Sequence, residues 1–286
     1  MKTFIGAYHC NPSILGILAL SVTSMFSLSA QDTLSNGKAL NIPFRKYGVS
    51  IGNSYEFTGI RINFADNNVR KVNGLNVTGW FKMFKNQNAI VNGISIGVMP
   101  VAGTLQPINI GIIGLGTENH SNGLTIGGLV IGGDVNGLSL SGLIIMADGT
   151  KGKMSGVALS GIVIGSESAI NGLAVGGLAV GTDGNINGLT ASTAYMRSKG
   201  IVRGVTVTAG YLNAFTYKGI AIAGYSRSSQ MYGLSVAIFN KTKELRGIQV
   251  GLLNIAKNNP KGLRVLPIVN IHLKKAITND ERLNNE

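Results

Sequence analysis

The chain has 286 residues, including 41 glycines and 6 prolines, with 44% hydrophobic residues, 13% charged residues and a formal net charge of +13. This hydrophobic content excludes an intrinsically disordered chain, and the glycines do not recur at every third position as collagen requires. One large domain or two ordinary domains fit the length.

Residues 1–30 have the three parts of an export signal. Lys2 is their only charged residue, an apolar run extends from Ile14 to Phe26, and a small-residue stretch ends at Ala30. A charged start, an apolar middle and a small-residue cleavage region are typical of a secretory signal peptide. The alternative is a buried or membrane helix, for which the apolar run is short.

The rest of the chain divides into three predicted segments. We expect residues 31–47 to form an N-terminal cap or linker, residues 48–273 a glycine-rich β-repeat domain, and residues 274–286 a polar C-terminal tail. Because stacked repeats expose strand edges at their ends, the two flanking segments are expected to cover these edges. Cys10 lies in the predicted signal, so the exported chain would have no cysteine for a disulfide.

A glycine followed by an apolar residue, any residue and a second apolar residue recurs throughout the repeat domain. These anchor glycines are Gly48, Gly59, Gly74, Gly93, Gly123, Gly137, Gly156, Gly172, Gly188, Gly204, Gly219, Gly233, Gly247 and Gly262. Pro107 takes the place of glycine in the one long interval. A recurring interval of about 16 residues is typical of a repeating β architecture.

Each unit reads as two short strands joined by a bend. In one unit, Leu124 and Ile126 alternate before a glycine pair, and Leu129 and Ile131 alternate after it. Alternation with a period of two is typical of strands. A bend at the glycine pair would keep all four apolar side chains pointing inward, and the Asn-Gly pairs suit turns with positive φ.

Two architectures fit these units. The first is an all-β, narrow parallel β-solenoid of about 15 short repeats, and the second is an antiparallel outer-membrane β-barrel with a pore or transport role. Residues 97–190 contain no aromatic residue, although membrane barrels carry aromatic girdles, and the chain ends in a polar segment. We therefore expect the solenoid and keep the barrel as the alternative.

Several units also resemble those of a known family. The units that begin at Gly247 and Gly262, with the segments Phe57–Asn63 and Val72–Asn76, are similar to those of uncharacterised bacterial surface-repeat proteins. That family carries tandem glycine-leucine-x-x-glycine-leucine-x-asparagine units behind an export signal. The resemblance covers most of the chain after the signal, but the central units have glycine pairs in place of a glycine and an asparagine. It implies an outer-membrane-associated or cell-surface location, in preference to a periplasmic one, and no activity.

Charge is distributed unevenly. Residues 31–96 hold eight Lys or Arg and three acids, residues 97–190 hold two and five, and residues 191–286 hold fourteen and four. For an exported protein, this balance predicts an anionic envelope polymer, a membrane surface or another protein as partner, and no nucleic acid. The alternative is that the charges only keep a β-rich protein soluble.

The sequence contains no recognisable catalytic motif. Outside the predicted signal it has only His120 and His272, and no serine lies in a G-x-S-x-G elbow with triad partners. Asp134, Asp148 and Asp183 lie in glycine-containing turns, where capping is expected and calcium binding is the weaker alternative. The sequence predicts a protein that is not an enzyme and has no cofactor, metal site or small-molecule substrate.

Two features are candidate interaction sites. The first is an aromatic and basic stretch that suits a membrane interface or, alternatively, covers the flank of the solenoid, namely Trp80, Phe81, Lys82, Phe84 and Lys85. The second is an apolar stripe that the expected inward pattern places outside, namely Val130, Ile144, Val163 and Ala179. The same pattern places a small, partly polar column outside, namely Thr125, Ser139, Ala158, Ala174 and Thr190.

Overall fold

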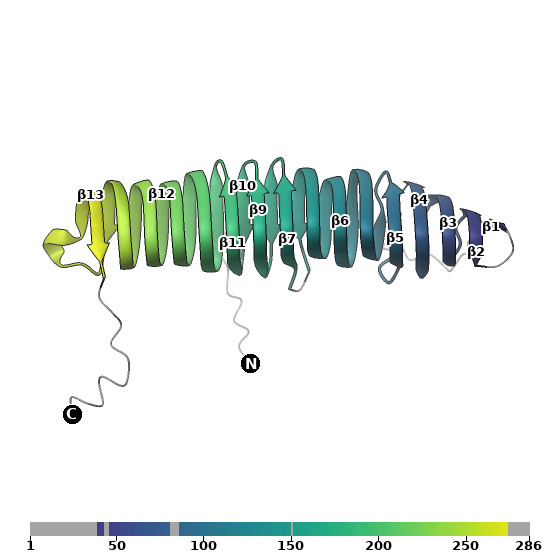
Figure 1. Ribbon diagram of the computed structural model, residues 1–286, viewed down its shortest axis with the longest axis horizontal. Helices are drawn as coiled ribbons and strands as arrows, with labels where there is room; N and C mark the ends of the chain where they lie inside the picture. The colour runs from purple at the N-terminus through teal and green to yellow at the C-terminus, as the bar shows by residue number, and fades with distance from the viewer. Residues whose placement is uncertain (1–38, 43–45, 81–85, 150, 274–286) are drawn as a thin grey trace, which may run out of the picture. The chain divides into compact units, whose positions relative to one another are not determined.

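The computed structural model describes residues 39–42, 46–80, 86–149 and 151–273, and this part of the chain is an all-β solenoid. The chain divides into two units, Met1–Asn36 and Gly37–Glu286, and all the described residues belong to the second. Within this second unit, successive coils stack along one long axis (Figure 1). The narrow β-solenoid expected from the repeats is confirmed.

Every element of the solenoid except one short 3-10 helix is a strand. In chain order the elements are β1 (Ala39–Ile42), β2 (Tyr47–Gly52), β3 (Glu56–Ala65), β4 (Lys71–Trp80), β5 (Ile90–Gly97), β6 (Val101–Ala147), β7 (Lys153–Ser160), β8 (Val163–Ser166), β9 (Ala169–Gly176), β10 (Ala179–Thr182), β11 (Asn185–Ser192), β12 (Tyr195–Ala256), η2 (Lys261–Leu263) and β13 (Val265–His272). The long elements β6 and β12 each wind through several coils (Figure 1).

Successive coils run parallel to one another. Gly59 of β3 pairs with Gly74 of β4, which pairs with Gly93 of β5, and the same in-register pairing links β7, β9 and β11. Only the end strands are antiparallel, since β1 pairs with β2 and β13 pairs with β12. The alternative of an antiparallel barrel is therefore wrong.

The anchor glycines stack into one column along the solenoid, which we call the glycine column. Thirteen of them, from Gly48 to Gly247, have φ between 90° and 155°, a region that side chains with a Cβ rarely adopt. A Cβ added at Gly172 would lie 2.1 Å from the carbonyl oxygen of Gly156 in the preceding coil, and Pro107 occupies the column position between Gly93 and Gly123. Apart from the position of Pro107, the column thus favours glycine for both backbone conformation and close packing.

The prediction that Gly262 continues this column is wrong. Gly262 lies in η2, and nothing lies within 4 Å of a Cβ added there. The chain turns at Pro260 and returns as β13, which pairs antiparallel with the last coil. The repeat therefore ends at Gly247, and β13 covers the open strand edge that a further parallel coil would have covered.

The expected direction of the first strand in each unit is also wrong. Leu138 and Leu189 are 41% and 45% exposed, whereas Ser139 and Thr190, which follow them, are 1% and 0% exposed. The column expected outside, Thr125, Ser139, Ala158, Ala174 and Thr190, is buried throughout. The aliphatic residues that flank this column face outward.

The reason is the limited volume of the interior. Large apolar side chains two residues before most column glycines, such as Ile170 and Ile186, are buried, and so are Ile145, Ile164 and Val180 of the second strands. These two sets fill the narrow core. The position between the outward aliphatic residues then has room only for small or hydrogen-bonded side chains.

The interior of the first coils is polar. Arg61 is fully buried, pairs with the carboxylate of Asp66, and donates to Asn76 Oδ1 at 2.7 Å. Asp66 also accepts hydrogen bonds from Asn76 at 3.2 Å and from the Thr78 hydroxyl at 2.9 Å. A buried charge is tolerated here because it has a counter-ion and several hydrogen-bonding partners.

Gly172→Ala should destabilise the solenoid by more than about 1 kcal/mol, because the column position combines positive φ with a backbone clash. The matched control is Gly181→Ala, since the nearest atom to a Cβ there is 3.8 Å away and its φ is not positive. Urea unfolding followed by circular dichroism measures both. Equal losses in the two variants would contradict the role of the column.

Asp66→Asn should destabilise the first coils by about 3 kcal/mol, because it leaves the Arg61 charge buried without its counter-ion. Asp183→Asn is the control, since it breaks the exposed pair with Lys199 and should have a much smaller effect. Hydrogen exchange of residues 56–80 reports the loss locally, because repeat proteins unfold from their ends. Unchanged protection in Asp66→Asn would disprove the assignment.

Candidate binding surface

The first strand of every coil presents two aliphatic side chains to the outside, one and three residues after the column glycine. The position between them is buried in each coil, as Thr190 illustrates between Leu189 and Ala191. The same two positions are stacked from coil to coil, so they form two parallel columns that we call the aliphatic face. None of their side chains is buried.

Each column contains sixteen residues. The first contains Ile42, Val49, Ile60, Leu75, Ile94, Ile108, Leu124, Leu138, Val157, Leu173, Leu189, Val205, Ile220, Leu234, Ile248 and Ile271. The second contains Leu40, Ile51, Ile62, Val77, Ile96, Ile110, Ile126, Leu140, Leu159, Val175, Ala191, Val207, Ile222, Val236, Val250 and Val269.

The aliphatic face is continuous from one end of the solenoid to the other. At the N-terminal end Leu40 of β1 pairs with Ile51, and at the C-terminal end Ile271 of β13 pairs with Ile248. Sixteen strands at about 4.8 Å spacing make a face about 70 Å long and, with two side chains across, about 10 Å wide. Its area exceeds the largest apolar patch of a typical monomeric protein, which marks it as an interaction surface.

A ladder of amides borders the aliphatic face on the side of the glycine column. Asn92 donates to Asn73 at 3.0 Å, Asn136 donates to Asn122 at 3.0 Å, and Asn187 donates to Asn171 at 2.9 Å. Each of these residues directly precedes a column glycine, as the Asn-Gly pairs in the sequence indicated. The ladder supplies hydrogen bonds between coils on their outer surface.

In the last coils this border becomes cationic. Arg203 and Lys218 occupy the positions of the ladder asparagines, and Arg203 donates to Asn187 Oδ1 at 3.3 Å. Lys218 and Arg246 each lie 5.4 Å from the centre of the Tyr232 ring, one coil away from it on either side. The C-terminal third of the aliphatic face is therefore bordered by three cations.

Exposed aromatic side chains lie beside the aliphatic face in the first coils. Tyr47 and Phe64, each two residues outside the columns, are 68% and 78% exposed, and Trp80 is 48% exposed in register with Ala65. Trp80 was a predicted interface residue, and the structure places it beside the large apolar surface. The other predicted residues of this stretch, Phe81, Lys82, Phe84 and Lys85, lie outside the described residues.

The prediction that Val130, Ile144, Val163 and Ala179 form an open outer stripe is wrong, because their exposures are 0%, 8%, 8% and 5%. Ile144, Val163 and Ala179 are in register, but all four residues of β8 are buried, so alternation does not separate core from solvent here. The hydrogen bond from Asp148 N to Gly132 O sets the register between these two coils. In this register Val130 aligns with the core residue Ile145. The predicted stripe aligned Val130 with Ile144 because both lie seven residues after a column glycine, and this alignment is wrong by one residue.

The column of Ile144, Val163 and Ala179 continues into a ladder of tyrosines. Ala179 pairs with Tyr195, whose ring stacks on that of Tyr211 at 5.8 Å between centroids, and Tyr211 stacks on Tyr225 at 5.2 Å. The sequence analysis did not place these aromatics together. Their spacings of 16 and 14 residues match the repeat and could have revealed the stack.

Among the described residues, the structure brings together no catalytic constellation. His120 Nδ1 lies 3.3 Å from Asp134 Oδ2, a pair that the sequence did not reveal, but Asp134 also accepts from Lys153 N at 2.9 Å, as a turn-capping residue does. No group of three or more His, Cys, Asp or Glu in the described ranges could hold a metal ion. No helix among these residues is long and apolar enough to cross a bilayer.

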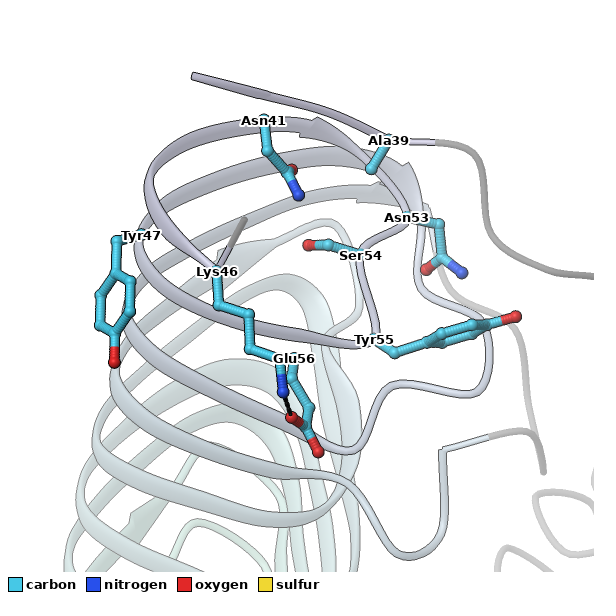
Figure 2. Close-up of a pocket in the computed structure, with 8 residues that line it drawn as sticks. All are labelled: Ala39, Asn41, Lys46, Tyr47, Asn53, Ser54, Tyr55 and Glu56. Atoms are coloured by element: carbon cyan, nitrogen blue, oxygen red, sulfur yellow. Dashed lines mark hydrogen bonds and ion pairs between the residues drawn. The ribbon is translucent and has the colours of Figure 1, made fainter. Parts of the chain in front are cut away.

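A pocket of about 510 Å³ opens at the N-terminal end of the solenoid. Figure 2 shows Lys46 reaching Glu56 on one side of it, and Asn41 and Ser54 are among the other residues that line it. The hydrogen bond and charge of Lys46, then the charge of Arg70, lower the pKa of Glu56. The ionised carboxylate is thereby held as a counter-ion, which suits closure of the first coil better than proton transfer.

Acidic residues stack at one corner of the central coils. The pairing of Ala147, Ser166 and Thr182 places the residues that follow them, Asp148, Glu167 and Asp183, side by side. Partial desolvation, followed by the charge and hydrogen bond of Asp148 and the charge of Asp183, raises the pKa of Glu167. The ionised form of Glu167 is therefore less favourable in the fold than in the unfolded chain.

Glu167→Gln should raise the melting temperature at pH 7. A raised pKa means that protonated Glu167 favours the fold at low pH, and this contribution is lost as the pH rises through the folded-state pKa. The variant removes the penalty of ionisation, so its advantage at pH 7 should disappear at about pH 3.5. Thermal melts at both pH values test this, and an advantage that persists at the lower pH would contradict it.

Comparison with protein-family models, with curated proteins and with solved structures finds no significant match. The solenoid and its surfaces therefore carry the functional argument for this chain.

Proposed function

We propose that this protein is an exported, non-enzymatic component of the bacterial cell envelope that lies against a lipid membrane surface through its aliphatic face. The observation that carries the proposal is the face itself, an uninterrupted apolar surface along the whole described solenoid. The signal-like N-terminus and the resemblance to surface-repeat proteins support the envelope location.

Burial of the aliphatic face is the driving force. Each 100 Å² of apolar surface removed from water contributes about 2.5 kcal/mol before the costs of association are subtracted. A rigid face needs no ordering on binding, unlike a peptide that folds into an amphipathic helix at the interface. The glycine column and the stacked coils hold these side chains in position in advance.

The borders of the face match a membrane interface. Tyr47, Phe64 and Trp80 lie beside one end, and aromatic rings are favoured at head-group depth. Arg203, Lys218 and Arg246 border the other end, where they would meet anionic head groups. A second copy would bring the same net charge of +13 with it, so electrostatics favour an anionic lipid surface over self-association through this face.

The double variant Leu138→Thr with Leu189→Thr tests the proposal. We expect it to bind vesicles of phosphatidylcholine with 30% phosphatidylglycerol about tenfold more weakly than the unmodified chain, because both residues lie in the centre of the face. Leu143→Thr with Leu178→Thr is the matched control, since these leucines are 47% and 53% exposed but lie outside the face. Vesicle flotation measures all three proteins.

All variants retain the apolar run at 14–26, so any contribution of that segment to binding is common to them. Equal binding by the two double variants would overturn the proposal. Sedimentation velocity without lipid adds a second readout. A dimer that only Leu138→Thr with Leu189→Thr disrupts would show that the face serves self-association instead.

A further inference from the structure

The C-terminal coils carry a second surface, on a different part of the coil from the aliphatic face. A groove of about 430 Å³ is lined by residues of these coils from Arg197 to Lys257. Its lining includes six basic residues, namely Arg197, Lys199, Arg227, Lys241, Lys243 and Lys257. No carboxylate lines it.

These cations come from different coils and are brought together by the stacking. The pairing of Thr182 with Ser198, and the hydrogen bond of 3.2 Å between Ser228 and Thr242, align equivalent corner positions of successive coils. The basic residues flank these corner positions in the sequence, so the solenoid arranges them as a series along its axis. The spacing between adjacent coils is about 4.8 Å.

Most of this charge is not neutralised within the described solenoid. Lys199 pairs with Asp183 at 2.6 Å at one end of the groove, and it is the only one of the six with an ion pair among the described residues. Glu244, the one acid between residues 191 and 273, pairs instead with Arg246, which lies outside the groove. A concave site with several unpaired cations concentrates the positive potential that attracts anions.

The remaining lining is chemically mixed. Asn213 and Ser229 provide amide and hydroxyl groups between the cations, and Phe215 adds an apolar ring that is 59% exposed. A ligand that matches this lining has anionic groups, hydroxyl groups and an apolar ring face in repeated order. An acidic polysaccharide has all three.

We infer that the groove binds an acidic polysaccharide along the axis of the C-terminal coils. Individual exposed charge contacts are weak, so a single acidic sugar gains little, whereas a polymer that bridges several coils combines many such contacts. Single-stranded nucleic acid is the less suitable polyanion, because its binding sites use successive aromatic platforms and this groove contains only Phe215. This inference is independent of the aliphatic face.

The test uses alginate, a polymer of uronic acids, as the probe. The full chain should bind alginate in low salt, and should bind neutral dextran and monomeric glucuronate at least tenfold more weakly. Lys241→Gln with Lys243→Gln should reduce alginate affinity about tenfold and flatten its salt dependence. Arg203→Gln with Lys218→Gln removes the same charge outside the groove and should change affinity less than twofold. Affinity electrophoresis and calorimetry measure these effects.

Three results would overturn the inference: equal binding of alginate and dextran, equal losses in the two double variants, or tighter binding of single-stranded oligonucleotide than of alginate. Circular dichroism checks that the variants fold, which is expected because the substituted side chains lie at the surface. The test also distinguishes this inference from the membrane proposal. Leu138→Thr with Leu189→Thr should retain full alginate binding whether or not it loses vesicle binding.

Discussion

The close packing of one glycine on the next is the constraint on which this structure depends. Each column glycine has positive φ, and from Gly59 to Gly247 each lies so close to the preceding coil that a Cβ would overlap a backbone carbonyl oxygen. This contact joins the first strands in register from β2 to β12. Glycine loses more conformational entropy on folding than any other residue, and here the burial of the interior side chains of each coil offsets that loss.

The narrowness of the coil explains the distribution of apolar residues. Two inner columns, represented by Ile186 and Val180, fill the core, and the buried position between the outward aliphatic side chains holds small or polar residues such as Ser139 or Thr190. The remaining aliphatic residues have no interior to enter. They line the outside instead, and the stacking of identical coils converts two exposed side chains per coil into one long surface. The binding surface is thus a consequence of the same geometry that determines the core.

The two ends of the solenoid differ chemically although their backbones repeat. The first coils enclose Arg61 and Asp66 in a polar network, whereas Tyr217, whose pKa burial raises to about 12, lies inside a late coil and donates to Ile220 O at 2.7 Å. At one outer corner the column changes from acidic Asp183 to basic Lys199. The solenoid therefore presents a different surface on each side and at each end while one backbone pattern is kept.

The sequence by itself determined the repeat and the parallel solenoid, because glycine spacing and Asn-Gly pairs express local backbone requirements. It also indicated the basic C-terminal third. Only the tertiary structure decided which side of each strand faces inward, since alternation is symmetrical and the available core volume depends on both strands of the coil. Val130 and Ile144 show the same limit, because a one-residue difference between coil lengths changes which residue enters the core. The groove around Lys241 is likewise a tertiary property, because its cations are brought together only when distant coils stack.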